Sequence, residues 1–473
     1  MAKANDRLIR ITNNFLGLII LSEDYDQMKN IRCSRFLFLT LTATFAFSLE
    51  INAQEPILGS QQIDLPDVYF QNADGFVPEC HEAFPGWLVT DPEFNQDELL
   101  AVWKTGPTIK KDSTIKTHGS VFITPIDTLT GDFYSVGQVQ INEANPVPRG
   151  TVINGPEWAN SQRGWEIYYS CYTADLKRVR LCRISRDQGE WRVFPLLASD
   201  GIGARNPSKN SILPAPNLYY QHYEGVWKGR AGLTKGNFGW RQDIENPTDT
   251  ILSSDIGQGR WMPDGERIVH IKAVRQNGNS IKQLAIYNTT TQEDRLIFFD
   301  GRNRRDPFPW EAPELGGKLA LVAVVEKLEN NSWDVEVYRE DGQENWITWN
   351  VFTPIHKNFR ASFSPESFIF QEKSYVSAVS YLGSDFLGNP SIIWIASVNP
   401  DLPETDKVRR IISREINFSH QPSLFSVKGD PESLVIRNGK QVRVYYVDHV
   451  SNSKKSSEST PRLMNCDTGL TVP

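Results

Sequence analysis

One stretch of the sequence reads Arg260-Trp261-Met262-Pro263-Asp264-Gly265-Glu266-Arg267-Ile268-Val269, in which an aromatic residue and a tight turn precede a short apolar run. Looser copies recur at intervals of roughly 50 residues, each with a Trp, Pro or Phe ahead of a run of β-branched and aromatic residues. They lie at Pro85-Gly86-Trp87, Asn154-Gly155-Pro156-Glu157-Trp158, Arg205-Asn206-Pro207, Asp306-Pro307-Phe308-Pro309-Trp310, Arg360-Ala361-Ser362-Phe363-Ser364-Pro365 and His420-Gln421-Pro422. A repeat of this length built from strands and turns predicts a β-propeller.

The predicted fold class is therefore all-β, with a single β-propeller whose blades contain about four antiparallel strands each. Seven blades are preferred, and six are the alternative. The composition agrees, because 13 Trp, 15 Tyr and 24 Phe stand beside only 4 Met, and no long helical periodicity is present. A pair of β-sandwiches is the alternative fold, but it does not explain turn signals that return at blade length.

Residues 1–53 are predicted to precede the folded domain. Met28 is the better functional start, because basic residues follow it, then the apolar segment 36–49, and then Ala53 as a cleavage point. This is the layout of a secretory signal. A single membrane anchor is the alternative, although the apolar segment is shorter than the ~20 residues that span a bilayer. We expect a secreted or periplasmic protein without stable membrane insertion.

The remaining chain is predicted to form the propeller over residues 54–450, followed by a Ser/Lys-rich tail at 451–473. Four cysteines remain after removal of the leader: Cys80, Cys171, Cys182 and Cys466. An even number in an exported chain favours disulfides, and three pairings are possible. A hairpin would bring Cys171 to Cys182, and Cys80 to Cys466 would then join the two ends of the ring; four separate buried thiols are the alternative.

The charge pattern argues against several classes of partner. The formal net charge is −7 at pH 7, and no basic run is long enough for a nucleic-acid groove. The basic clusters Lys110-Lys111 and Arg302-Asn303-Arg304-Arg305 are interpreted as solvated loop charges, with contact to an acidic ligand as the alternative for the second. No cysteine pair has the spacing of a zinc site, so we expect neither a metal nor a cofactor.

The segment Trp261-x-Pro263-Asp264-Gly265-x-x-Ile268 resembles the repeat signature of TolB-like propellers. Its Pro-Asp-Gly forms a tight turn, and its aromatic residue packs between blades. Only this unit matches fully, while Glu157-Trp158 and Phe363-Ser364-Pro365-Glu366 keep parts of it. In that family the propeller is an exported interaction platform, so the resemblance implies binding of a partner rather than catalysis.

A propeller gathers residues that lie just ahead of each apolar run around one funnel, although they are far apart in the sequence. The candidate ligand-binding residues are Arg205, Asn206, Arg260, Asp306, Glu311, Arg360 and Gln421, and the candidate catalytic residues are His81, Glu157 and His420. Arginine could bind carboxylates or sulfates, and carboxylates beside histidines could act as acid and base. The alternative is that these charges only satisfy backbone groups or one another.

A second candidate surface is the aromatic run 219–224, in which Tyr219 and Tyr223 share one face by strand alternation and could stack on a sugar or peptide. Packing against a neighbouring blade is the alternative. Motifs of serine hydrolases, nucleotide-binding proteins and zinc proteases are absent. We therefore predict a non-catalytic propeller that binds a protein or glycan at its funnel, and the alternative is a carbohydrate-active enzyme, either an acidic-polysaccharide lyase or a glycoside hydrolase.

Overall fold

The computed structural model describes residues 72–105, 118–136, 139–140, 147–148, 156–161, 164–172, 179–195, 205–209, 217–222, 238–243, 249–253, 256–327, 332–342, 345–351, 359–382, 391–413, 425–451 and 460–472. The chain divides into two compact units, Met1–Glu55 and Pro56–Pro473, and all described residues belong to the second. The predicted leader lies outside them. No helix in the described part has the length and apolar character needed to cross a bilayer.

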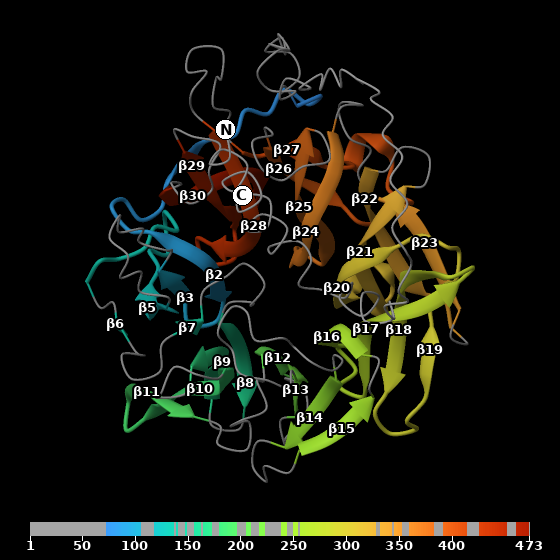
Figure 1. Ribbon diagram of the computed structural model, residues 1–473. Coiled ribbons are helices and arrows are strands. Elements are labelled where there is room, and N and C mark those ends of the chain that lie inside the picture. The colour runs from blue at the N-terminus through green and yellow to red at the C-terminus, as the bar shows by residue number, and fades with distance from the viewer. Residues whose placement is uncertain are drawn as a thin grey trace, which may run out of the picture. The chain divides into compact units, whose positions relative to one another are not determined.

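The described strands form seven four-stranded antiparallel sheets that follow one another along the chain (Figure 1). The first contains β2 (Val89–Asn95), β3 (Leu100–Thr105), β5 (Val121–Pro125) and β6 (Val139–Gln140). The second contains β8 (Glu157–Ser161), β9 (Gly164–Tyr172), β10 (Val179–Asp187) and β11 (Glu190–Pro195). The third contains β12 (Arg205–Lys209), β13 (Asn217–His222), β14 (Phe238–Asp243) and β15 (Asp249–Ser253).

The next three sheets repeat the same order. They are β16 (Ile256–Trp261), β17 (Arg267–Gln276), β18 (Asn279–Asn288) and β19 (Asp294–Leu296); β20 (Arg304–Ala312), β21 (Lys318–Lys327), β22 (Ser332–Glu340) and β23 (Trp346–Asn350); and β24 (Phe359–Phe370), β25 (Lys373–Leu382), β26 (Ser391–Ser397) and β27 (Arg409–Ile411). A small two-stranded sheet pairs β4 (His118–Gly119) with β7 (Val147–Pro148), and two short 3-10 turns, η4 (Pro313–Leu315) and η5 (Glu404–Asp406), complete the described elements.

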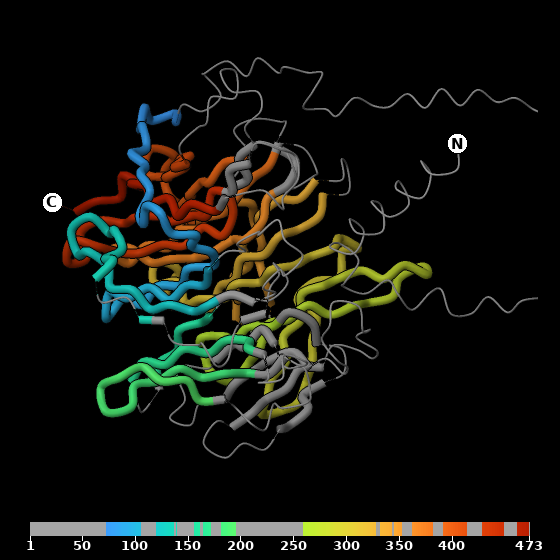
Figure 2. Tube along the Cα trace, turned by 60° about the vertical axis from the view of Figure 1, so that its left-hand side comes forward, coloured from blue at the N-terminus to red at the C-terminus, as the bar shows by residue number. Residues whose placement is uncertain are grey.

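The last sheet closes the ring by combining both ends of the described chain. Its order is β28 (Phe425–Ile436), β29 (Gln441–Ser451), β30 (Thr460–Thr471) and then β1 (Cys80–Glu82), which lies beside the C-terminal strands (Figure 2). Cys80 stands opposite Cys466 in this pairing and forms a disulfide with it, and a second disulfide joins Cys171 to Cys182. The expected disulfides are thus present.

The first strand of each sheet contacts the first strand of the next: β2 with β8, β8 with β12, β12 with β16, β16 with β20, β20 with β24, β24 with β28, and β28 with β2. These seven strands therefore form a closed inner ring, which is the arrangement of a β-propeller. The predicted fold class is confirmed. The apolar runs noted in the sequence, such as 319–325, turn out to be the second strands, and the segments ahead of them are the innermost ones.

The hydrophobic core lies between neighbouring sheets. Val322 and Val337 of one sheet pack with Val376 and Trp394 of the next, and each of these side chains is at most 1% exposed. Alternation along the strands places apolar residues on both faces of a sheet, so each sheet is covered on both sides by its neighbours. Burial between blades therefore holds the ring together and leaves the inner strands free to carry polar residues.

Two sequence-based boundaries are corrected by the strand order. The segment 451–473 is not a tail as a whole, because β30 forms the third strand of the closing sheet. Its Ser/Lys-rich part, 452–459, lies outside the described residues. The first and last inner strands also differ from the predicted anchors, since they are β2 and β28 rather than the segments at Trp87 and Pro422.

Candidate functional site

Most inner strands contain the same irregularity, a shift of register at an X-Pro pair. The shift occurs in β2, β12, β20, β24 and β28, and the residue before the proline has a positive φ at Asp91 (52°), Asp306 (51°), Ser364 (45°) and Asp430 (56°). Proline has no N–H to give to the ladder, so a bulge is a position in a sheet that tolerates it. Backbone strain at a non-glycine residue is thus repeated around the ring.

At the residue after the proline, the inner strand resumes its antiparallel pairing with the second strand of the sheet. Glu93 pairs with Val102, and Glu432 pairs with Tyr445 in the same way. The residues that follow the proline are Glu93, Glu157, Ser208, Phe308, Glu366 and Glu432. In β16 the ladder resumes at Gly259, and Arg260 follows it. Because the inner strands meet in a ring, the position after the proline brings four glutamates together, and Arg260 comes in from the neighbouring position of β16.

Arg260 is at the centre of this group. Its Nη1 lies 3.8 Å from Oε1 of Glu157, and its Nη2 lies 3.8 Å from Oε1 of Glu366, so each contact is longer than a hydrogen bond. The guanidinium also lies over the ring of Phe308, at 4.8 Å from its centroid. The three charged side chains remain 18–31% exposed, so solvent reaches the cluster although protein surrounds it.

The carboxyl groups raise the pKa of one another. Burial, followed by the charges of Glu157 and Glu366, raises the pKa of Glu93 well above its usual value, and burial together with Glu93 does the same to the pKa of Glu432. Burial raises the pKa of Glu366 to about 8, although Arg260 opposes the shift. Burial alone would disfavour the charged guanidinium, but the surrounding glutamates raise the pKa of Arg260. Part of the cluster is therefore protonated near neutral pH.

A second pair of acids extends the cluster. Burial and the neighbouring Asp91 raise the pKa of Asp430 well above its usual value, and the two carboxyl groups share a hydrogen bond. Asp91 in turn forms an ion pair with Lys104 of β3. Both acids stand before a proline in the strained bulge, so the same turn that places the glutamates also places this pair. We call Glu93, Glu157, Arg260, Glu366, Asp430 and Glu432 the axial cluster.

Five of the sequence-predicted residues have side chains that the structure describes. Glu157, Arg260 and Asp306 lie on inner strands, and the charge of Asp306 acts on Glu366. Glu311 lies near the far end of β20 and is exposed. His81 lies on the outermost strand β1, where its Nε2 and Oδ1 of Asp132 are 2.6 Å apart, so it is not part of the axial cluster.

Other predicted residues lie where the structure is not described in full. Arg205 and Asn206 are on inner strand β12, Arg360 is on inner strand β24, and Tyr219 is on β13, but their side chains lie outside the described residues. Tyr223, His420 and Gln421 fall outside them altogether. Their roles stay predictions.

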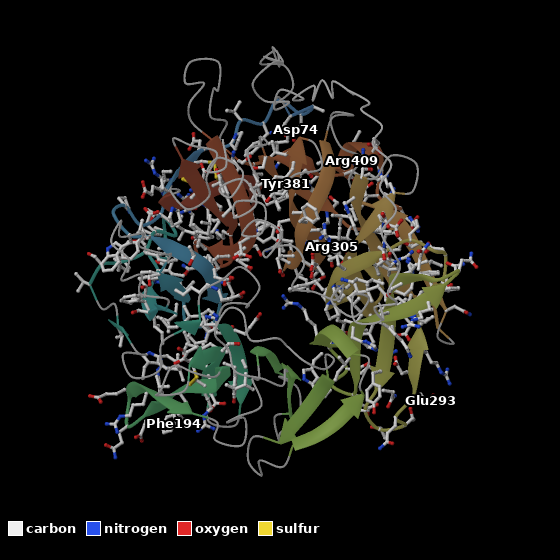
Figure 3. The ribbon with its side chains drawn as sticks, viewed as in Figure 1. Asp74, Phe194, Glu293, Arg305, Tyr381 and Arg409 are labelled. Atoms are coloured by element: carbon white, nitrogen blue, oxygen red, sulfur yellow. A yellow bond between two sulfur atoms is a disulfide. The ribbon has the colours of Figure 1, made fainter. Side chains whose placement is uncertain are left out.

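Sequence reasoning missed Glu93, Glu366, Asp430 and Glu432 as site residues. A partial signal was present. Pro-Glu occurs seven times in the sequence, and four copies, at 92–93, 156–157, 365–366 and 431–432, place the glutamate on the four inner strands concerned, whereas those at 78–79, 313–314 and 403–404 do not. The aromatic anchors obscure this dipeptide, because they follow residues that pack between the blades. Figure 3 shows the labelled Arg305 nearer the middle of the ring than Phe194 and Glu293, which lie at its periphery.

The axial cluster can bind a polar ligand and can hold or release protons. Protonated carboxyl groups and the guanidinium donate hydrogen bonds, and ionised carboxylates accept them. Within the described ranges, no group of three or more His, Cys, Asp or Glu side chains is arranged to hold a metal ion.

Comparison with known proteins leaves the function open. No family model matches the chain, and no curated protein matches it. Among solved structures it is similar to TolB from Acinetobacter baumannii, with 13% identity over 79% of this chain and 81% of that one at a TM-score of 0.37. It is similar to polysaccharide lyase Uly1, with 10% identity over 80% and 89% at 0.44, and to an endo-arabinase from Bacteroides thetaiotaomicron VPI-5482, with 9% identity over 66% and 95% at 0.33. The fold assignment therefore depends on the strand order itself.

Proposed function

We propose that this protein is an exported β-propeller that binds a glycan or protein ligand at its axial cluster. The observation that carries the proposal is the convergence of four glutamates from four inner strands on one guanidinium, with Asp430 beside Glu366 as a further acid. Crowding like charges costs stability, because each buried carboxyl must either stay protonated or repel its neighbours. Proteins usually avoid burying several like charges together. Departures from this rule are expected at functional sites.

The chemistry of the cluster favours a glycan. Sugar hydroxyls both donate and accept hydrogen bonds, so they can pair with ionised carboxylates, protonated carboxyls and Arg260 alike. Phe308 holds the guanidinium in place, since its ring lies 4.8 Å from Arg260 and packs against the hydrophobic core. Export is proposed with this function, because two disulfides persist only in an oxidising compartment.

A second candidate is a glycoside hydrolase at the same place. Glu157 and Glu366 lie on either side of Arg260, and burial raises the pKa of both carboxyls, that of Glu366 to about 8. A carboxyl that stays protonated near neutral pH can act as a general acid, while a second one activates water or attacks the sugar. This pair is the specific support for the catalytic alternative.

The test is affinity electrophoresis of the mature protein in gels that contain neutral or acidic polysaccharides, together with an assay for released reducing ends. We expect at least one polysaccharide to retard the protein without being cleaved, and Glu157→Ala with Glu366→Ala to remove the retardation. Glu190→Ala is the matched control, because this glutamate is 76% exposed on β11. Retardation that survives in the double variant would contradict the proposed site. Released reducing ends that need Glu366 would favour the hydrolase instead.

A further inference from the structure

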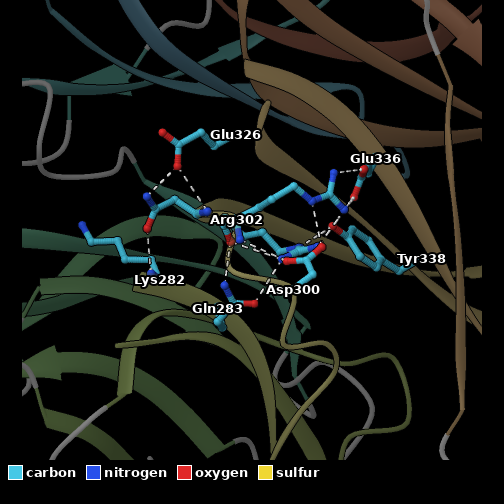
Figure 4. Close-up of polar contacts among 9 residues, drawn as sticks. Lys282, Gln283, Asp300, Arg302, Glu326, Glu336 and Tyr338 are labelled. Atoms are coloured by element: carbon cyan, nitrogen blue, oxygen red, sulfur yellow. Dashed lines mark hydrogen bonds and ion pairs between the residues drawn. The ribbon is translucent and has the colours of Figure 1, made fainter. Parts of the chain in front are cut away.

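The basic cluster 302–305 contains three arginines with different surroundings. Arg302 and Arg304 are held by the protein itself: Arg304 donates to Asp300 and to the Tyr338 hydroxyl at 2.7 Å each, and Arg302 binds Glu336 at 2.7 Å (Figure 4). Arg304 is 1% exposed, so it is not the solvated loop charge that the sequence suggested. These two arginines are structural, because their hydrogen-bonding capacity is spent on partners within the fold.

Arg305 differs from both. Its guanidinium is held between two aromatic rings, 3.9 Å from the centroid of Phe363 on β24 and 4.2 Å from that of Trp333 on β22. No described residue accepts a hydrogen bond from its side chain, and its buried Nε has no partner. The one described carboxylate within ion-pair distance is that of Asp306, whose Oδ2 lies 3.9 Å from Nε. The two Nη nitrogens are therefore fixed in direction but carry no hydrogen bond to the described part of the protein.

The position of Arg305 links it to the axial cluster. It directly precedes the strained Asp306-Pro307 bulge of inner strand β20, and Phe308, one residue beyond that bulge, lies under Arg260. Arg305 remains 30% exposed, so a ligand can reach it. Arg205 occupies the corresponding position before the bulge of β12, so two inner strands have an arginine at this point of the ladder.

The electrostatics agree with a cation that lacks a full counter-charge. Burial lowers the pKa of Arg305, and the charges of Asp306 and Glu326 compensate this only in part. Glu326 is already engaged, because Asn303 donates a hydrogen bond of 2.6 Å to its carboxylate. Burying an arginine without hydrogen bonds is costly unless a partner completes the site.

We propose that Arg305 binds an oxyanion, the carboxylate or sulfate of an acidic sugar, on the ligand that occupies the axial cluster. The inference rests on the proposed function and names the chemical class of its ligand. The aromatic rings hold the planar guanidinium so that its Nη edge can form the paired hydrogen bonds typical of arginine and oxyanions. The raised pKa values of Glu93 and Glu366 reduce the negative charge that such a ligand would meet at the axial cluster.

The test uses small probes, sulfate and galacturonate, with galactose as the neutral counterpart and the ionic strength held constant with sodium chloride. Tryptophan fluorescence is the readout, because Trp333 packs on the guanidinium. We expect saturable responses to both anions in the wild type. The affinity should fall about tenfold or more in Arg305→Gln. It should be partly retained in Arg305→Lys, which keeps the positive charge but loses the paired N–H donors of the guanidinium. The ratio of the two affinities then indicates whether the natural ligand is sulfated or carboxylated.

The matched control is Arg339→Gln. Arg339 is also a partly buried arginine of this sheet, with an unpartnered Nε and its guanidinium 5.9 Å from the Trp349 ring, but it lies on the third strand, away from the inner ring. We expect it to respond as the wild type does. No saturable response in the wild type, or an unchanged response in Arg305→Gln, would overturn the proposal. Anion binding that depends on Arg305 but persists in Glu157→Ala with Glu366→Ala would leave this inference standing, even if polysaccharide retardation failed.

Discussion

At the scale of single residues, the decisive feature is the glutamate that follows a proline on the inner strand. Glu93, Glu366 and Glu432 each resume the ladder after a bulge, and their carboxyl groups come close enough to shift the pKa of one another. A single inner strand supplies only one or two such groups. The unusual chemistry arises because equivalent positions of a repeat meet at one place.

Glu366→Gln is predicted to make stability less dependent on pH. The folded-state pKa of Glu366 is about 8 and the usual value is 4.5, so between these pH values the native protein binds a proton that the unfolded chain releases. Its contribution to stability is therefore complete below pH 4.5 and is lost as the pH rises toward 8. Relative to the wild type, Glu366→Gln should gain on the order of 4 kcal/mol between pH 5 and pH 8.5.

Urea unfolding followed by circular dichroism at both pH values measures this difference. Glu293→Gln, a glutamate that is 54% exposed on the loop before β19, should show none. If Glu366→Gln destabilises the protein equally at both pH values, the carboxyl does not hold its proton in the folded state.

At the scale of elements, the sequence predicted that a strand-and-turn unit repeats, but it did not predict reliably which segment of each unit forms the innermost strand. The anchors at Trp158, Arg260 and Trp310 do fall on inner strands, because aromatic residues and turns recur there with the blades. The first anchor was wrong, since Trp87 lies between β1 and β2, where it stacks on Phe84, and the last, 420–422, lies outside the described residues. Aromatic residues pack at many positions of a blade. Among the described residues, a non-glycine residue with positive φ before a proline occurs in the bulges of inner strands, so it marks the innermost strand better than an aromatic residue does.

The closing element supports a prediction about the two disulfides. Cys80–Cys466 spans 386 residues and Cys171–Cys182 spans 11, so the first restricts the unfolded chain far more. Replacing Cys80 and Cys466 by serine should cost up to about 3 kcal/mol more than replacing the other pair. Guanidinium unfolding under non-reducing conditions would measure both losses. Equal losses would mean that the closing sheet is held by its strand pairing alone.

At the scale of the whole molecule, the ring explains why the site could be predicted only in part. Sequence alone indicated that polar residues ahead of the apolar runs converge, and Glu157 and Arg260 do so. It could not indicate which strand of each blade is innermost, and so it placed His81 in the funnel, whereas the structure has it on an outer strand. Strand order within a sheet depends on contacts between distant segments, which local patterns do not encode.

The central claim is that the inner ring forms one ligand site at the axial cluster. Hydrogen–deuterium exchange of the full chain, with and without a polysaccharide that retards it in gels, tests this most directly. We expect slower exchange in the inner strands β2, β8, β16, β24 and β28 around the axial cluster, with the outer strands β11, β19 and β23 unchanged. Protection confined to outer strands, with no change in the inner ring, would contradict it.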